Sequence, residues 1–238
     1  MSHTTETTAP RLVADDAAAA VLEDLLASRW SCREFLPGEV PHEEIVRILD
    51  IARRSASWCN TQPWHVDVTS GAATEQLRAA LAESLAAGNP PAPDIPFPGA
   101  YEGVYQQRRR ESGWQLYESL GIDKGDREAS MRQTLRNFDF FGAPHVAIIT
   151  TERDLGPYGA VDCGIFIANL LLAAHSRGVA SIPQAALATQ SPVLRQHFGL
   201  PDSRQVLVGI SFGYPQMASP VNHYRTARQS IDELVTFH

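Results

Sequence analysis

Two short basic clusters stand near opposite ends of this 238-residue chain: Arg29, Trp30, Ser31 and Arg33 in the first, and Arg225 and Arg228 in the second. Arginines a few residues apart beside irregular backbone can grip an oxyanion, because the guanidinium fork suits bidentate hydrogen bonds to phosphate. A solvated basic helix end would give the same pattern at the first cluster, and a soluble tail would give it at the second. Each cluster is therefore a candidate phosphate-binding group, with the solvated alternative open.

A polar loop between two tryptophans, SWCNTQPW, holds a second group of candidates, Ser57, Asn60 and Gln62. Asparagine and glutamine side chains each carry a donor and an acceptor, which is what the amide-and-imide edge of a heterocycle or a polyol requires. The alternative is an ordinary polar loop before a strand, and for Trp64 we favour a place in the core.

Familiar catalytic patterns are absent or weak in the sequence. No GxGxxG follows a strand, no GxxxxGK[ST] occurs, and no histidine, cysteine or carboxylate group has metal-ligand spacing, so no metal is expected. GISFG, residues 209–213, matches the GxSxG of serine hydrolases, but that elbow needs a helix directly after the serine. Tyr214 and Pro215 follow instead. We therefore expect Ser211 to be a buried strand residue.

Other reactive side chains have a simpler interpretation. Cys32 and Cys59 are predicted to be small buried fillers, since nothing nearby signals an activated thiolate. The histidines at 65, 145 and 175 are read as strand or helix residues rather than bases. The run Arg108–Arg110 falls in a predicted helix and is read as a solvated face.

Loosely alternating helices and strands must position these groups. Apolar periodicity and turn residues predict helices at 15–29, 42–54, 73–87, 101–120, 126–138, 158–177 and 191–199, and strands at 65–69, 144–150 and 205–212. The proline-rich stretch PPAPDIPFPG, residues 90–99, is read as a surface excursion rather than a linker. The tail, residues 213–238, has too few apolar residues for a core of its own. The pattern indicates an α/β or α+β protein.

Composition narrows the class of protein further. Hydrophobic residues make up 44% of the chain and charged residues 20%, so a sizeable core is possible. The net charge of −7 disfavours nucleic-acid binding, and no apolar run is long enough to span a bilayer. No secretory signal is visible, and three scattered cysteines fit a reducing cytoplasm. We expect a flexible arm at residues 1–14 and a single domain at 15–238.

Taken in order, several stretches resemble the FMN-dependent nitroreductase family: RWSCREF, ASWCNTQPW, ASIPQAAL, VLVGISFGYP and NHYRTARQSIDEL. The similarity runs from about Ala18 to Val235, and the central stretch with RNFDFFGAP is similar to the branch of nitroaromatic and nitrobenzoate reductases. The resemblance implies an α+β fold with a mixed sheet wrapped by helices. It also implies a homodimer with FMN at the interface and the tail crossing to the partner.

The resemblance further implies a cofactor site. Arg29 and Ser31, with Trp30 between them, match positions near the FMN phosphate and ribityl chain, and Arg225 and Arg228 match the pair that completes the phosphate site. Other matches lie around the flavin ring: Arg33 at the pyrimidine edge, Ser57, Asn60 and Gln62 in a loop partly from the other subunit, and Pro183, Gln184 and Ala185 beside N5. The sequence departs from the family at Ala56, where proline is common, at Trp58 and Cys59, and at the pair Gln184-Ala185.

The implied activity is NAD(P)H-dependent reduction of nitroaromatic or quinone acceptors through FMN, by ping-pong kinetics. Arg33 would favour the reduced cofactor electrostatically, and no catalytic acid is assigned. Three alternatives remain open: a non-catalytic flavin-binding or sensing protein, a reductase of halogenated or alkene substrates, and, least favoured, a hydrolase built on GISFG. The choice between NADH and NADPH is open as well.

Overall fold

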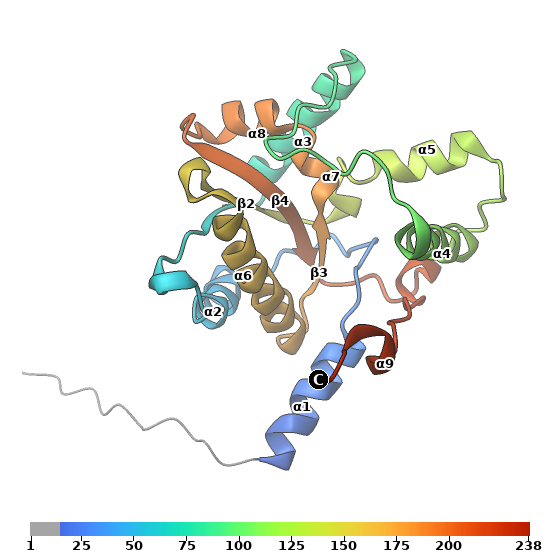
Figure 1. Ribbon diagram of the computed structural model, residues 1–238. Helices are drawn as coiled ribbons and strands as arrows, with labels where there is room; N and C mark the ends of the chain where they lie inside the picture. Colours follow the sequence, from blue (N-terminus) through green and yellow to red (C-terminus); the bar gives the residue numbers. More distant parts are fainter. Residues whose placement is uncertain (1–14) are drawn as a thin grey trace, which may run out of the picture.

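The computed structural model describes residues 15–238 (Figure 1); the expected arm at 1–14 lies outside the described residues. The helices are α1 (Asp16–Ser28), α2 (His42–Ala52), α3 (Ala72–Ala86), α4 (Gly103–Ser119), α5 (Arg127–Leu135), α6 (Gly156–Ser176), α7 (Ala185–Ala188), α8 (Ser191–Phe198) and α9 (Ile231–Leu234). The strands are β1 (His65–Thr69), β2 (His145–Glu152), β3 (Ala180–Gln184) and β4 (Arg204–Gly213). Short 3-10 turns include η1 (Trp58–Asn60) and η4 (Pro220–Asn222).

The four strands form one sheet in the order β1-β2-β4-β3, and each neighbouring pair is antiparallel. The α+β class is confirmed. The sheet differs in detail from the mixed sheet that the resemblance implied, because parallel pairing among residues 15–238 is confined to an isolated bridge between Ser31 and Ser181. Strand β3 was not among the predicted strands, since it is short and contains Pro183, which demotes a strand pattern.

Helices cover both faces of the sheet, and strand β2 contributes side chains to the core on each face. Its side chains alternate between two cores: Val146 and Ile148 pack with residues of α3, α7 and α8, whereas Ala147 and Ile149 pack with residues of α2 and α6. Seven of the eight residues of β2 are buried, as expected of a strand covered on both faces. Figure 1 shows α2 and α6 together on one side of the sheet, and α4 and α5 standing away from it.

Helix α6 is the central helix of one layer. With the turn before it, α6 is long and apolar enough to be considered as a membrane span by length and composition alone. It is instead a core helix, because Phe166, Leu170 and Leu171 are buried and the helix packs on α1, α2, β2 and β3. The other face of α6 stays exposed, with Val161 and Ile165 at 57% and 40% exposure.

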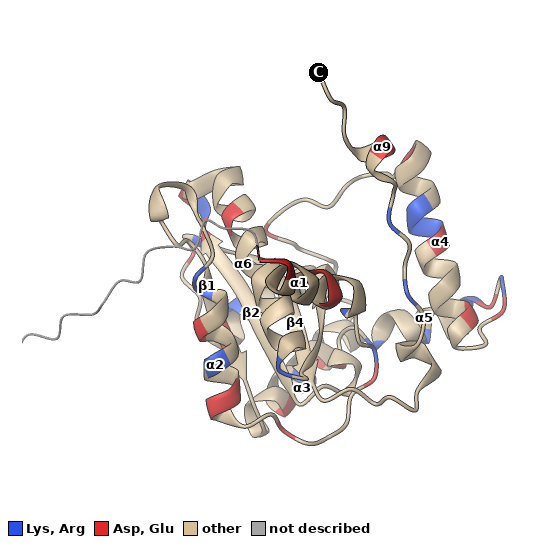
Figure 2. Ribbon diagram, turned by 90° about the horizontal axis from the view of Figure 1, so that it is seen from below, with Lys and Arg blue, Asp and Glu red and all other residues tan. Residues whose placement is uncertain are grey.

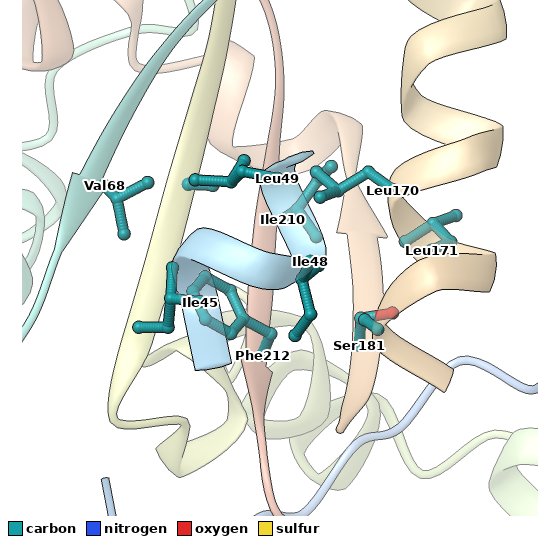
Figure 3. A pocket seen from close by; sticks show the side chains of 11 residues that line it. Ile45, Ile48, Leu49, Val68, Leu170, Leu171, Ser181, Ile210 and Phe212 are labelled. Atoms are coloured by element: carbon teal, nitrogen blue, oxygen red, sulfur yellow. The ribbon is translucent and has the colours of Figure 1, made fainter. Parts of the chain in front are cut away.

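A small apolar cavity lies between α2, α6 and the sheet (Figure 3). Its volume is about 20 Å³, and among its lining residues only Ser181 carries a polar side chain. A site of this size holds at most one water molecule, which would lack the two to four polar partners that buried water needs. The cavity is therefore an imperfection of core packing rather than a candidate ligand site.

The proline-rich stretch packs on the body, as predicted for a surface excursion. Its Asp94 carboxylate accepts hydrogen bonds from the guanidinium of Arg195 at 2.9 Å and from the backbone N–H of Val206 at 2.8 Å, and Arg153 lies 3.4 Å away. The Asp94 side chain is only 14% exposed. One carboxylate thus ties this excursion to α8 and to the start of β4.

We expect Asp94→Ala to lower the free energy of unfolding by about 2–3 kcal/mol, because it leaves two guanidinium groups and a backbone N–H without their acceptor. Urea denaturation measures the change. Glu128→Ala is the matched control, since it removes an exposed ion pair with Arg132 one helical turn away and should cost about 0.5 kcal/mol or less. Equal losses in the two variants would contradict the anchoring role of Asp94.

Candidate functional site

The structure brings the two predicted basic clusters together in one pocket of about 270 Å³. Its lining combines the end of α1, the segment after it, the tail and one residue of α4: Leu26, Ala27, Arg29, Trp30, Ser31, Arg33, Ser112, Tyr224, Arg225, Thr226 and Arg228. We call this the arginine pocket. Figure 2 shows the tail running beside α4, with basic stretches on both. A larger groove of about 930 Å³ continues from the pocket between α4 and the tail.

Backbone pairing explains why residues nearly 200 positions apart meet. The segment after α1 lies between β3 and the start of the tail: the N–H of Cys32 donates to the carbonyl of Ser181 at 3.1 Å, and the N–H of Leu36 donates to that of Tyr214 at 2.8 Å. Phe35 forms an isolated bridge with Pro215. Both basic clusters are thereby fixed to the same end of the sheet.

Asn222 holds the two segments together, and it is not among the site residues predicted from the sequence. Its side chain is fully buried. The amide oxygen accepts the N–H of Arg33 at 2.9 Å, and the amide nitrogen donates to the carbonyls of Glu34 at 2.8 Å and Gln216 at 2.9 Å. A single amide therefore satisfies backbone groups of both segments. No local pattern marks such a residue, because its partners lie far away in the sequence.

The pocket concentrates positive charge without neutralising it. Within residues 15–238, Arg29, Arg33, Arg225 and Arg228 form no ion pair with a carboxylate. Burial and the neighbouring charge of Arg228 lower the pKa of Arg29, and burial lowers the pKa of Arg33. Clustered, partly desolvated cations are costly unless an anion joins them. The arrangement is therefore suited to bind a dianion such as a phosphate monoester.

Aromatic rings hold two of these guanidinium groups in place. The Arg225 guanidinium carbon lies 4.6 Å from the centre of the Trp30 ring, and that of Arg33 lies 5.6 Å from the Tyr224 ring. Arg225 and Arg228 also donate to carbonyls of the tail itself, the former to Asn222 at 2.8 Å. The indole N–H of Trp30 is buried and has no hydrogen-bond partner in the described part of the chain.

His175 lies behind the arginine pocket and is a structural residue, as predicted. The Ser28 hydroxyl donates to the Asp24 carbonyl at 2.6 Å, so the His175 Nε2–H donates to the Ser28 oxygen at 2.7 Å. The same imidazole meets Trp30 edge to face, with ring centres 5.8 Å apart. Burial and the charges of Arg29 and Arg225 lower the pKa of His175, which favours the neutral ring at physiological pH.

The predicted strip at the end of β3 is only partly available to a ligand. Ala185 is exposed and Pro183 half-buried, but the Gln184 side chain is buried. The Gln184 amide donates to the Asn137 carbonyl at 2.8 Å and accepts from the Ser211 hydroxyl. Any ligand contact from Gln184 must therefore use its backbone. Ser211 is fully buried within β4, which excludes the hydrolase elbow.

The polar loop of residues 57–62 lies away from the arginine pocket in the same chain. Its Trp58 N–H donates to Asp162 on α6 at 3.1 Å, whereas the pocket meets α6 at His175. These two residues are thirteen positions apart on the helix, or about 20 Å along its axis. One chain therefore does not bring Ser57, Asn60 and Gln62 to the predicted phosphate site.

One cysteine prediction is confirmed and one is wrong. Cys32 is buried, and burial raises the pKa of its thiol to about 11, so it is no thiolate nucleophile. Cys59 is exposed rather than buried, because the turn η1 carries it on the outer side of the loop. The histidines at 65 and 145 lie in strands, as predicted.

Comparisons with known proteins agree on one family. A family model described as "Nitroreductase family" matches residues 26–214. The chain is 37% identical over 220 residues to "Nitroreductase NfnB" of Mycolicibacterium smegmatis, covering 92% of this chain and 93% of that protein. It is 36% identical to a "4-nitrobenzoate reductase" of Pseudomonas putida at the same coverage. The crystal structure of the FMN-dependent nitroreductase NfnB from Mycobacterium smegmatis in complex with NADPH superimposes with a TM-score of 0.88, covering 94% of this chain and 100% of that one.

Proposed function

The chain belongs to the nitroreductase family, and we propose that it is an NAD(P)H-dependent FMN oxidoreductase that reduces nitroaromatic or quinone acceptors. The observation that carries the proposal is the arginine pocket, in which guanidinium groups from both ends of the chain converge and, among residues 15–238, pair with no carboxylate. The phosphate of FMN supplies the missing negative charge. Bound in this pocket, FMN would supply the redox chemistry between the nicotinamide donor and the acceptor.

The residues of the pocket have distinct parts in holding this cofactor. We assign Arg29, Arg225 and Arg228 to the phosphate, with the Ser31 hydroxyl as a further donor. Their charge-assisted hydrogen bonds are the strong kind that fixes orientation as well as affinity. Trp30 holds the Arg225 guanidinium against the pocket wall.

The remaining site residues surround the flavin ring in this proposal. Arg33, turned toward Tyr224 and bonded through its guanidinium to the Ser31 carbonyl at 3.2 Å, is assigned to the pyrimidine edge. The backbone of Pro183, Gln184 and Ala185 is assigned to the region of N5. No acid is assigned, because solvent can deliver protons to an exposed acceptor.

A homodimer completes the site in this proposal, since the loop carrying Ser57, Asn60 and Gln62 then reaches the cofactor from the other subunit. Exposed apolar surface supports it. Helix α1 has no buried residue, and its Val21, Leu22 and Leu26 are each more than half exposed. A 13-residue helix is marginal on its own and needs packing to be stable. The exposed face of α6 offers further apolar area for a second copy.

We further propose that residues 15–238 form a single FMN-binding domain and that the protein is cytoplasmic, with neither nucleic acid nor membrane as a partner. The nicotinamide donor is NADH or NADPH. The acceptor is a nitroaromatic compound in the first instance, because the relatives carry that activity in their names.

We expect the purified protein to be yellow, with flavin absorption that bleaches under anaerobic NADH or NADPH and returns when a nitroarene is added. Steady-state NAD(P)H oxidation must depend on the nitroarene, which separates an enzyme from a flavin-binding protein without catalysis. A halogenated arene and an activated alkene serve as comparison acceptors. A colourless protein that does not bind added FMN contradicts the proposal.

A further inference from the structure

The loop of residues 57–62 has a costly backbone conformation. Three of its residues that are not glycine lie in the left-handed region: Cys59 at φ +50°, Asn60 at +55° and Gln62 at +48°. The Cβ of an L-residue crowds the following carbonyl in that region, so such conformations persist only where the surroundings enforce them. Residues 58–62 are nevertheless exposed. Something beneath the loop must therefore hold it.

Two polar side chains on α6, those of Asp162 and Asn169, form hydrogen bonds to the loop and to the segment before it. Asp162, 6% exposed, accepts the N–H of Trp58 at 3.1 Å, and the Asn169 amide donates to the Ser55 hydroxyl at 2.8 Å. The Ser55 hydroxyl in turn donates to the Ala52 carbonyl at 2.6 Å, where α2 ends. Asp162 and Asn169 are seven residues apart and so share one face of the helix. Asp162 is the one charged side chain among the buried residues of α6, whose other members are apolar or glycine.

The hydrogen bond from the Trp58 N–H to Asp162 is the one that attaches the loop to the rest of the protein. Inside the loop, the N–H of Gln62 donates to the Ser57 hydroxyl at 3.0 Å, and that of Asn60 donates to the Ser57 carbonyl at 3.0 Å. These bonds shape the loop but do not attach it to the body. Between residues 57–62 and the rest of the described chain, the hydrogen bond to Asp162 stands alone, supported by the edge-to-face contact of Trp58 with Tyr158 at 4.8 Å.

Burial of the Asp162 carboxylate on α6 also costs free energy of folding. This carboxylate is buried, and no Arg, Lys or His of residues 15–238 forms an ion pair with it. An apolar residue would pack on the neighbouring helices at less cost. A buried acceptor without an ion-pair partner in residues 15–238, bonded to a strained and exposed loop, indicates a role in positioning that loop rather than in general stability.

We propose that Asp162, supported by Asn169, is a positioning residue that holds loop 57–62 in the conformation presenting Asn60 and Gln62 to the flavin. The inference rests on the proposed function. Asp162 itself touches neither cofactor nor substrate; it acts through the Trp58 N–H. Because the role requires an acceptor oxygen and not a charge, asparagine should replace it.

The test compares Asp162→Ala with Asp162→Asn in the full-length protein, measuring the Kd for FMN and the KM and kcat with a nitroarene. Loss of one buried hydrogen bond predicts that Asp162→Ala raises Kd and KM roughly tenfold. Asp162→Asn should stay within about threefold of the wild type, since it keeps the acceptor. Asn169→Ala should raise the Kd for FMN and the KM for the nitroarene by about threefold. This variant provides a second test if Asp162→Ala does not fold.

Ser84→Ala is the matched control. Ser84 is equally buried, on α3 across the sheet, and its hydroxyl donates to Gln190 at 2.8 Å. The control should lower thermal stability but leave Kd and KM unchanged. The inference fails if Asp162→Ala behaves like this control, or if Asp162→Asn is as damaging as Asp162→Ala. A wild-type protein that binds no FMN would instead count against the proposed function itself.

Discussion

Arg29→Ala is expected to weaken FMN binding by about 2–4 kcal/mol, or roughly 30- to 700-fold in Kd. Arg29 is half-buried in the arginine pocket, where it is assigned a charge-assisted bond to the phosphate. Removing the guanidinium takes away that bond, and the remaining arginines do not replace its geometry. Titration of flavin-free protein with FMN, followed by flavin fluorescence, measures the change. The purified variant should lose its yellow colour on dilution or dialysis.

Without bound FMN, the Arg29→Ala substitution should not lower the thermal stability of the protein. Arg29 and Arg228 repel each other when no anion is bound, and this repulsion contributes to the lowered pKa of Arg29. Removing one of the two charges should therefore leave the melting temperature of the flavin-free protein unchanged or higher. A residue needed only for folding would lower it. The increase in melting temperature on adding FMN should shrink, because stabilisation by a ligand follows its affinity.

Arg110→Ala is the control for charge alone. Arg110 is an exposed arginine on α4 that does not line the arginine pocket. The variant changes the net charge by the same amount and should keep FMN affinity within about twofold, because solvent and salt screen exposed charges. If Arg29→Ala and Arg110→Ala bind FMN equally well, the phosphate assignment is wrong.

Local patterns predicted those parts of the fold that local chemistry determines. The alternation HVDVT predicted β1 with the bounds that the structure shows, and the acidic start and leucine spacing of 15–29 predicted α1, which Asp15 caps. The five-residue β3 was missed because Pro183 argues against a strand and because its stability comes from pairing with β4, a long-range contact. Helix α7 has only four residues and no periodicity to read.

The residues of the site likewise fall into those that a local pattern predicts and those that it does not. Arginine clusters are visible in a sequence as candidate anion sites because the guanidinium group suits phosphate, and the structure brings Arg29, Arg33, Arg225 and Arg228 into one pocket. Asn222 could not be predicted, since a buried amide is defined by partners that the sequence does not reveal. The same holds for Asp162, which reads as an ordinary polar position near a helix start until its contact with Trp58 is known.

Arg33→Gln is expected to lower the midpoint potential of bound FMN by roughly 20–60 mV while much of the FMN affinity remains. Arg33 is assigned to the pyrimidine part of the ring, where a bound flavin would gain negative charge on reduction. A unit charge about 5–6 Å away at an effective dielectric constant near 20 is worth about 3 kcal/mol, and 1.4 kcal/mol corresponds to about 30 mV for two electrons. Glutamine keeps a donor but removes the charge.

The potential is measured by spectroscopic titration against a reference dye at constant pH and salt. Arg33→Lys is the matched control: it keeps the charge but loses the fork that donates to the Ser31 carbonyl and stacks near Tyr224. Its potential should therefore stay closer to that of the wild type than the potential of Arg33→Gln does. An unchanged or raised potential in Arg33→Gln removes Arg33 from the flavin edge. Because Arg33 is also fixed through its backbone by Asn222, substitution of the side chain should leave the segment after α1 in place, so the potential reports the charge and not a rearranged pocket.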